Sequence, residues 1–254
     1  RSAVRLQLGL ASSSISCADM QRLTSLTASG LGIASLEGLQ HAVNLSFLDA
    51  YANRISDLTP LAGLTSLEVL NLWINEVSDA SPLAGLTNLT FLSLADNLIN
   101  DISALRNLEQ LVVLGLFNND PQPYAQISDI SARANMTHIE DLALSGNAIS
   151  DISPLSNKTA LQSLILGNNL LSDLTPLAGN TELIYLHLSE NPIGNIGPLS
   201  GLTSLVELWI DSSVGSITSI EALSGMRQLE SLNLAGHNIA NLQPLAELTQ
   251  LTRL

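Results

Sequence analysis

The sequence predicts an α/β solenoid, in which short parallel strands stack turn upon turn. Three observations support this prediction: a strand leucine recurs along nearly the whole chain, its period is almost constant at 22 residues, and a conserved spacing of polar residues follows it within each period. Each turn of such a repeat can bury its apolar side only against its neighbours. Steps of 28 and 24 residues interrupt the period. The recurring leucines are Leu26, Leu48, Leu70, Leu92, Leu114, Leu142, Leu164, Leu186, Leu208, Leu232 and Leu254.

The third turn illustrates how one repeat is expected to bury its apolar side chains. The pattern LxxLxxLxLxxNxIxDIxPL is typical of leucine-rich repeats. It predicts a right-handed superhelix with a parallel sheet on the concave side and short 3-10 helical turns on the convex side. Most turns fill the same seven inward slots, which in the third turn are Leu67, Leu70, Leu72, Val77, Ala80, Leu83 and Leu86.

Polar residues at fixed offsets predict how the loops of each turn are held. An asparagine five residues after the strand leucine is expected to hydrogen-bond the backbone of adjacent turns, and Ser213 and His237 interrupt this ladder. A Thr-Pro or Ser-Pro pair predicts a capping hydroxyl followed by proline at the first helical position. The aspartate before the pair is predicted to form a turn, with a stack of calcium sites as the alternative. These aspartates are Asp57, Asp79, Asp101, Asp129, Asp151 and Asp173.

The two ends of the chain are expected to differ. Residues 1–25 depart from the repeat and predict an N-terminal helical cap, while residues 26–254 predict one continuous array of about ten turns. Ser16 to Asp19 forms a capping-box sequence, so a helix should start at Cys17 and lay Met20 and Leu23 over the first turn. The segment AVRLQLGL is expected to form a second short helix. No C-terminal cap is expected, and we expect the protein to continue beyond Leu254.

Composition and motifs exclude several functional classes. The net charge of −14 and the pI near 4.4 argue against nucleic-acid binding and against adsorption to anionic lipid. The sequence contains no run of about 18 apolar residues that would predict a membrane span. Cys17 is the only cysteine, so no intrachain disulfide can form, and we expect it to be a small buried hydrophobe. The absence of phosphate-binding, zinc-ligand and nucleophile motifs predicts that the chain is not an enzyme and needs no cofactor.

Aromatic residues indicate where the chain binds a partner. Seven of the eight fall at strand positions that alternate away from the leucine core, and are therefore predicted to line the concave face. In turns two to five, apolar residues of this face form two columns, which predict a contiguous exposed patch of the kind that marks interaction sites. The patch comprises Phe47, Val69, Phe91 and Val113 in one column and Tyr51, Trp73 and Phe117 in the other, with Ile74 beside Trp73.

A second cluster on the same face combines aromatic and acidic residues, which suits a partner that presents lysine or arginine. The alternative is that the aromatic residues only shield the sheet. A metal site at His187 is a weaker interpretation than a polar contact. The members of this cluster are Ile165, Tyr185, His187, Glu190, Glu207, Trp209 and Asp211.

Two insertions and two polar substitutions complete the candidate positions. The insertion at residues 120–125, which contains Tyr124, and the one around Val214 and Gly215 are predicted to lie on one edge of the solenoid, where they border the binding surface or form tolerated loops. Lys158 and Asn180 replace apolar residues at equivalent slots in consecutive turns. We expect both to be tolerated edge positions.

A family resemblance is carried by residues 15–67, ISCADMQRLTSLTASGLGIASLEGLQHAVNLSFLDAYANRISDLTPLAGLTSL, which resemble the cap and first repeats of bacterial internalin-type proteins. The repeat resemblance extends to Leu254. It implies a secreted or surface-attached bacterial protein whose concave face binds a host or cell-surface protein. Two alternatives remain open: an intracellular scaffold resembling the 22-residue-repeat regulators of phosphatases, and a module that binds glycans by stacking Trp73 or Trp209 on sugar rings.

Replacing Trp73 and Phe117 together by alanine is expected to abolish partner capture while leaving the melting of the array nearly unchanged.

Overall fold

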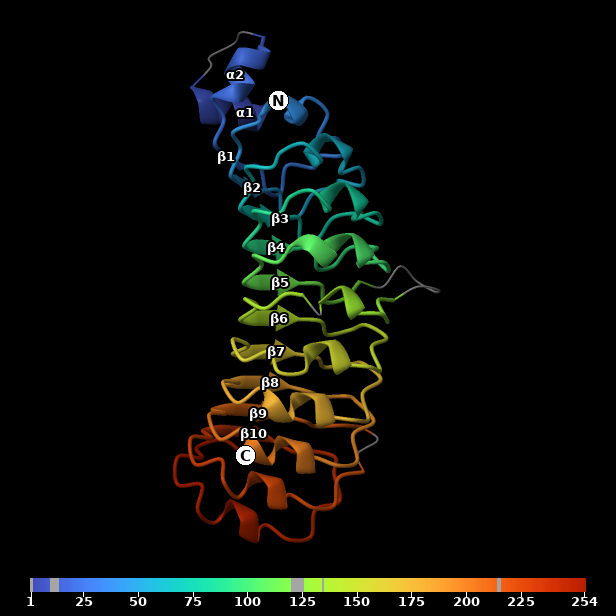
Figure 1. Ribbon diagram of the computed structural model, residues 1–254, viewed down its shortest axis with the longest axis vertical. Helices are drawn as coiled ribbons and strands as arrows, with labels where there is room; N and C mark the ends of the chain where they lie inside the picture. Colours follow the sequence, from blue (N-terminus) through green and yellow to red (C-terminus); the bar gives the residue numbers. More distant parts are fainter. Residues whose placement is uncertain (1, 10–13, 120–125, 134, 214–215) are drawn as a thin grey trace. The chain divides into compact units, whose positions relative to one another are not determined.

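The computed structural model describes residues 2–9, 14–119, 126–133, 135–213 and 216–254. The chain forms two compact units, Arg1–Gln126 and Ile127–Leu254. Each unit repeats one turn, in which a three-residue parallel strand is followed by a loop and a 3-10 helix. Figure 1 shows the strands on one side of each unit and the 3-10 helices on another. The predicted leucine-rich-repeat fold is confirmed.

The first unit begins with two helices, α1 (Ser2–Leu8) and α2 (Cys17–Gln21). Its strands pair in sequence order, with the strand leucines in register, so that Leu26 lies beside Leu48 and Leu48 beside Leu70. The strands are β1 (Ser25–Thr27), β2 (Phe47–Asp49), β3 (Val69–Asn71), β4 (Phe91–Ser93) and β5 (Val113–Gly115). The 3-10 helices are η1 (Leu39–His41), η2 (Thr59–Leu61), η3 (Ser81–Leu83) and η4 (Ser103–Asn107).

The second unit repeats the same arrangement. Its strands also pair in sequence order and in register. They are β6 (Asp141–Ala143), β7 (Ser163–Ile165), β8 (Tyr185–His187), β9 (Glu207–Trp209) and β10 (Ser231–Asn233). The 3-10 helices are η5 (Ser131–Arg133), η6 (Ser153–Leu155), η7 (Thr175–Gly179), η8 (Gly197–Gly201), η9 (Glu221–Leu223) and η10 (Gln243–Leu245).

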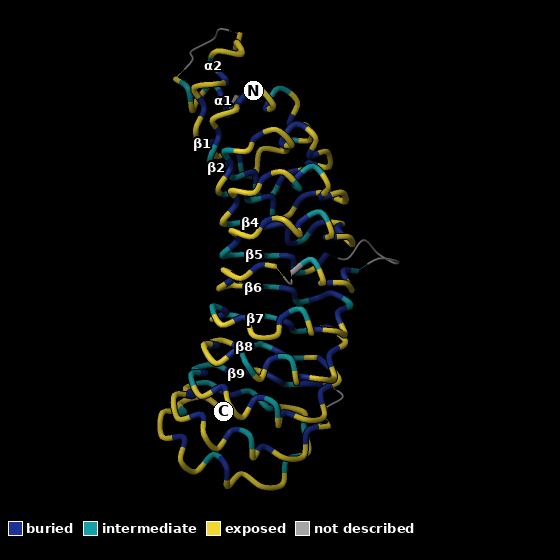
Figure 2. Tube along the Cα trace, viewed as in Figure 1, coloured by how far each residue is buried: buried dark blue, intermediate teal, exposed yellow. Residues whose placement is uncertain are grey.

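Aliphatic side chains fill the interior of each unit. All seven inward residues predicted for the third turn are at most 2% exposed. In Figure 2 buried residues alternate with exposed ones along each turn. Because the strand leucine is buried between two less buried neighbours, the residues on either side of it face away from the core. This alternation determines which side chains are available for binding.

The N-terminal helices largely confirm the sequence prediction. The Asp19 amide donates to Ser16 Oγ at 3.2 Å and the Ser16 amide donates to Asp19 Oδ2 at 3.0 Å, which forms the capping box and starts α2 at Cys17. The Ser16 hydroxyl also donates to Asp19 Oδ2 at 2.7 Å, and this bond, followed by the one from the Ser16 amide, lowers the pKa of Asp19. Met20 and Leu23 are buried as predicted. The prediction for Cys17 is wrong: it is exposed, because it occupies the first position of α2 rather than the inward-facing side that carries Met20.

Asparagine side chains join the turns within each unit. Asn97 is typical: its Nδ2 donates to the carbonyl oxygens of Leu72 and Leu94 at 2.9 and 3.2 Å, and its Oδ1 accepts from the Val77 amide at 2.9 Å. Because Asn97 is only 3% exposed, these contacts satisfy backbone groups that have no water to bond. The predicted ladder is therefore confirmed. In the second unit His237 takes a ladder position and donates from Nε2 to the Ile210 carbonyl oxygen at 2.6 Å.

The aspartates that precede the 3-10 helices form turns, as predicted. Asp57 Oδ1 accepts from the Thr59 amide at 2.8 Å and from the Thr59 hydroxyl at 2.7 Å. These bonds lower the pKa of Asp57, the hydroxyl contributing more than the amide. The prediction of a capping hydroxyl is wrong, because Thr59 donates to Asp57 instead of accepting from the helix. Pro60 is the second residue of the 3-10 helix rather than the first.

The prediction that Lys158 and Asn180 occupy edge positions is also wrong. Asn180 is fully buried and Lys158 is 7% exposed. Asn180 Oδ1 accepts from the Lys158 amide and its Nδ2 donates to the Leu155 carbonyl oxygen, both at 3.0 Å. A polar side chain is stable in this buried slot because it satisfies backbone groups of the preceding turn. Burial lowers the pKa of Lys158.

Candidate binding face on the strands

The strand face, by which we mean the side chains of each strand and its C-terminal extension that flank the buried leucines, carries every aromatic residue that the structure describes. None of these seven residues is buried in the core. Tyr185 and Trp209 are 46% and 38% exposed, and the other five are half-buried. The side chains therefore lie where strand alternation predicts, at a surface that a partner can reach.

The first unit holds an aromatic patch formed by Tyr51, Trp73 and Phe117. The ring centroids of Tyr51 and Trp73 are 5.1 Å apart, and those of Trp73 and Phe117 are 5.6 Å apart in an edge-to-face arrangement. Trp73 and Phe117 come from turns on either side of Ala95, which is fully buried. A small residue at position 95 lets the two rings meet across its turn. Such ring pairs add about 0.5–1.5 kcal/mol each beyond their buried area.

A hydrogen bond fixes the central ring of the aromatic patch. Trp73 Nε1 donates to Asp96 Oδ2 at 2.5 Å, and Asn118 Nδ2 donates to Asp96 Oδ1 at 3.2 Å. Both carboxylate oxygens of Asp96 are thus engaged within the unit. Asp96 was not identified from the sequence. Its position was a usable signal, because it directly follows Ala95, which occupies in its own turn the position that Trp73 and Phe117 occupy in the adjacent turns.

The first apolar column is separate from the aromatic patch. Phe47, Val69, Phe91 and Val113 are register partners on successive strands, as predicted, and all four are half-buried. Between this column and the patch lies a polar one, in which Asn71 Nδ2 donates to Asp49 Oδ1 at 3.0 Å. The prediction of one contiguous apolar patch is therefore wrong. On each strand the residue midway between the two columns also faces outward, and in these turns it is Asp49, Asn71, Ser93 or Gly115, none of which has an apolar side chain.

Ile74, next to Trp73, adopts an unusual backbone conformation. Its φ of +56° lies in the left-handed region, although Ile74 is β-branched. Equivalent turns place Asp96 and Asn118 in this conformation, and the short polar side chains of Asp and Asn tolerate it. Ile74 is also 41% exposed, so burial of its side chain does not offset the strain. Its apolar surface lies beside the aromatic patch.

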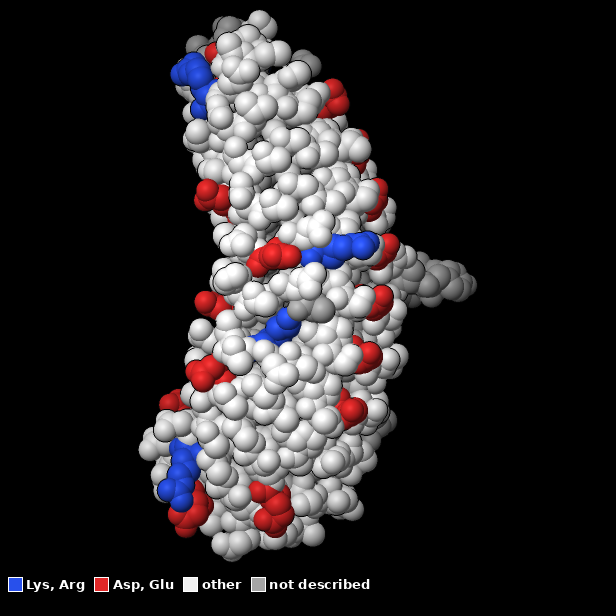
Figure 3. Space-filling view, viewed as in Figure 1, with Lys and Arg blue, Asp and Glu red and all other residues white. Residues whose placement is uncertain are grey.

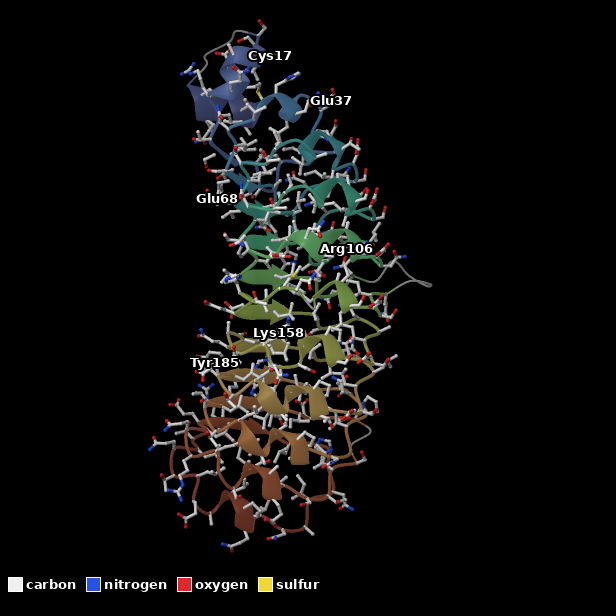
Figure 4. The ribbon with its side chains drawn as sticks, viewed as in Figure 1. Cys17, Glu37, Glu68, Arg106, Lys158 and Tyr185 are labelled. Carbon is white, nitrogen blue, oxygen red and sulfur yellow. The ribbon has the colours of Figure 1, made fainter. Side chains whose placement is uncertain are left out.

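The second unit holds an acidic aromatic cluster formed by Tyr185, His187, Glu207, Trp209 and Asp211. The rings of His187 and Trp209 are parallel, with centroids 4.5 Å apart. His187 Nε2 and Glu207 Oε1 are 2.6 Å apart. The strand register places Tyr185 beside Glu207 and His187 beside Trp209. Tyr185 lies on the side of β8 away from the 3-10 helices (Figure 4). The structure therefore brings these residues together as predicted.

Two other residues predicted to belong to this cluster, Ile165 and Glu190, have different surroundings. Ile165 is half-buried on β7 beside His187 in the register. Glu190 accepts from the Ser213 amide with both oxygens at 3.2 Å and from the Ser213 hydroxyl at 2.7 Å, so its carboxylate joins two turns. In the part of the chain that the structure describes, no three His, Cys, Asp or Glu side chains converge to hold a metal ion. Tyr124 and the rest of residues 120–125, with Val214 and Gly215, lie outside the described residues.

Comparison with known proteins agrees with the fold. The family model described as Leucine Rich repeats (2 copies) matches residues 65–107, 137–179 and 181–225, about half of the chain. The chain therefore belongs to the leucine-rich-repeat family. No curated protein sequence matches it.

Solved structures of internalins from Listeria monocytogenes are similar to the chain. InlC2 is 33% identical, with 82% of this chain and 91% of that chain covered and a TM-score of 0.76. InlF is 28% identical, with coverage of 99% and 93% and a TM-score of 0.64. The functional domain of InlJ, which includes a cysteine ladder, is 25% identical, with a TM-score of 0.77, and the chain spans 57% of its length. This chain is thus an internalin-like leucine-rich-repeat protein, whose own ladder is built of asparagine.

Proposed function

We propose that the chain is a protein-recognition module whose strand face binds a partner protein. The aromatic patch carries this proposal, because three rings pack on one another at a surface that the leucine core does not require. Trp and Tyr are the residues that most often dominate the binding energy of protein interfaces. The apolar column from Phe47 to Val113 and the exposed side chain of Ile74 would extend the contact.

The similarity to internalins further supports a bacterial adhesin that is secreted or attached to the cell surface and recognises a surface protein of another cell. Within the described ranges, no helix has the length and apolar character needed to cross a bilayer. We further propose that residues 1–25 cap one continuous array formed by residues 26–254. The buried Met20 and Leu23 support this role for the cap.

A binding array of purified cell-surface ectodomains tests the proposal. The wild-type chain is expected to bind at least one ectodomain, and Trp73→Ala should weaken that binding by about thirtyfold, as loss of a hot spot of about 2 kcal/mol predicts. Trp73→Phe, which keeps an aromatic ring in the patch, should retain most of the affinity.

Val43→Ala is the matched control. Val43 is a 45% exposed apolar residue of the same unit, in the loop before β2. It should bind as the wild type does. Equal loss of binding in Val43→Ala and Trp73→Ala would show that the patch is not the contact. A wild-type chain that binds no ectodomain, but binds a glycan array, would replace the proposal with sugar recognition.

A further inference from the structure

We propose that the acidic aromatic cluster binds a cationic side chain of the partner, with arginine as the preferred residue. This inference rests on the proposed function and identifies the chemistry that the second unit recognises. The guanidinium would lie against Trp209 and donate to Glu207 and Asp211. A planar guanidinium suits such a site because it can stack on an indole and form charge-assisted hydrogen bonds to carboxylates at the same time.

The order of residues along β9 creates the site. Glu207, Trp209 and Asp211 alternate with the buried Leu208 and Ile210, so all three lie on the strand face. Successive outward residues of a parallel strand are about 6.6 Å apart. Trp209 is therefore flanked by a carboxylate on each side along the strand, and 38% of its surface is exposed.

Each of the two carboxylates keeps one oxygen for a ligand. Glu207 uses Oε1 for His187, and Asp211 Oδ1 accepts from the Ser189 hydroxyl at 2.5 Å and from Asn233 Nδ2 at 2.9 Å. Glu207 Oε2 and Asp211 Oδ2 have no hydrogen-bond partner among the described residues. The bonds already formed hold the carboxylates in place, which lowers the entropy that a ligand must offset.

The aromatic wall of the site is also held in place. His187 stacks on Trp209, and Trp209 Nε1 donates to the Ser231 hydroxyl at 3.4 Å. Tyr185, which is 46% exposed, stands beside Glu207 in the register and adds a second ring. Two exposed rings next to two carboxylates favour an organic cation over a metal ion, because rings contribute to cation binding through their π faces.

Among the described residues, no lysine or arginine forms an ion pair with Glu207 or Asp211, although His187 lies within ion-pair distance of Glu207. Arg253, the register partner of Ser231, lies on the strand face of the following turn, two strands from Glu207. Strands β6 to β10 and their extensions carry no lysine or arginine at any described strand-face position from Asp141 to Ala235. Basic side chains are few in the view of Figure 3, where acidic ones recur. In the first unit, by contrast, both oxygens of Asp96 are already bonded to Trp73 and Asn118. Asp49, near Tyr51, uses only Oδ1 for hydrogen bonds, but it is a single carboxylate, whereas Trp209 is flanked by two. The cation site is therefore expected in the second unit.

The two tryptophans of the chain allow a direct test by NMR. We would label the full chain with nitrogen-15 and titrate it with the blocked tripeptide acetyl-Gly-Arg-Gly-amide, following the two indole N–H signals. The Trp209 signal, assigned with Trp209→Phe, is expected to shift and saturate, while the Trp73 signal stays in place as an internal control. The neutral analogue acetyl-Gly-citrulline-Gly-amide should leave both signals unchanged.

Matched variants separate the site from general acidity. Glu207→Gln and Asp211→Asn should each weaken binding of the arginine peptide by about tenfold, as loss of a charge-assisted hydrogen bond predicts. Glu230→Gln removes the same charge from an exposed residue of the same unit outside the strand face, and should leave binding unchanged. Amide spectra of each variant verify that it is folded.

Three results would overturn the inference. They are an unshifted Trp209 signal, an equal response to the citrulline peptide, and an equal effect of Glu230→Gln and Glu207→Gln. A stronger response to the lysine peptide acetyl-Gly-Lys-Gly-amide would retain the cation site but reverse the preference for arginine. If the arginine peptide fails while the ectodomain array still gives binding that depends on Trp73, only the cation site is rejected and the proposed function stands.

Discussion

The two units use the same turn but present different strand faces. In the first unit the rings of the aromatic patch contact one another, and the nearby carboxylate of Asp96 is fully engaged. In the second unit Tyr185 and Trp209 are exposed, and Glu207 and Asp211 each keep a free oxygen among the described residues. A repeat scaffold can therefore carry an apolar surface and a charged one on equivalent positions, because the buried leucines, the ladder asparagines and the turn aspartates that maintain the turn all lie off the strand face.

The same contrast holds at the left-handed position just before the ladder asparagine. Ile74 and Glu190 both occupy this position, with φ of +56° and +54°. The Glu190 carboxylate bonds Ser213, whereas the exposed side chain of Ile74 gives no comparable structural benefit. The strain at Ile74 therefore points to recognition, and the strain at Glu190 to the stability of adjacent turns.

The largest expected effect compares the rings of the two units. Trp73→Ala with Phe117→Ala should lower the free energy of unfolding by about 3 kcal/mol, because both ring contacts and half-buried surface are lost. Tyr185→Ala with Trp209→Ala should cost only about 1 kcal/mol, since these rings are more exposed. Urea denaturation measures both values. The ring contacts thus replace the sequence-based expectation that melting is nearly unchanged in the first pair.

Equal losses in the two pairs would remove the proposed difference between a self-packed patch and an exposed cluster. Trp73→Phe serves as the control, because it keeps a ring but loses the hydrogen bond to Asp96. It should lose less than the alanine pair.

A smaller effect of opposite sign is expected at the left-handed position. Ile74→Asn should stabilise the chain by about 1 kcal/mol, because asparagine adopts positive φ with less strain than a β-branched residue. Glu190→Asn should destabilise it by about 1 kcal/mol, since the bonds to Ser213 outweigh a similar gain. Thermal melting of the two variants beside the wild type measures both signs. A loss of stability in Ile74→Asn would contradict the strain assigned to Ile74.

The smallest expected effect is a loss of stability at acidic pH. Hydrogen bonds from the residue two positions on lower the pKa of Asp57, Asp101 and Asp173 below the ordinary value of 3.8. A lowered pKa means that these carboxylates stabilise the folded state above pH 3.8, and that this contribution disappears as pH falls through the folded-state values. Urea midpoints measured between pH 5 and pH 2.5 should therefore decrease.

Aspartate variants compare how much each unit contributes to the pH dependence of stability. Asp57→Asn with Asp101→Asn, in the first unit, should flatten the pH dependence more than Asp173→Asn in the second. Glu76→Gln, which removes a carboxylate outside these turns, is the control and should follow the wild type. If both aspartate variants also follow the wild type, these turns do not control acid stability.

Much of the fold could be predicted because each turn repeats a local rule. The 22-residue period, the ladder asparagines and the capping box at Ser16 depend on neighbours that are close in sequence or one period away, and the structure confirms them. The predictions for Lys158 and Asn180 were wrong because a polar residue at an apolar slot reveals substitution but not the backbone partner that makes it stable. The prediction that Cys17 is buried was wrong because a helix of five residues has few inward-facing positions.

For the candidate site, too, some features could be predicted from the sequence and others could not. Strand alternation was enough to place Trp73 and Trp209 on the strand face, whether or not a partner binds there. It also places Asp49 and Asn71 between the two apolar columns, which the prediction of one contiguous patch overlooked. It could not show that Trp73 bonds Asp96 or that Glu207 keeps an oxygen free. These contacts depend on rotamers and distances across turns, which a list of alternating positions does not contain.

The amino-acid sequence by itself determined the turn, its period and the side of the strand on which each residue lies, because periodic burial of leucine leaves few alternatives. Tertiary structure alone decided which side chains on that side satisfy one another and which remain available. The reason is physical: burial follows a pattern along the chain, whereas a hydrogen bond or a ring contact requires two groups from different turns to meet at the right distance and angle.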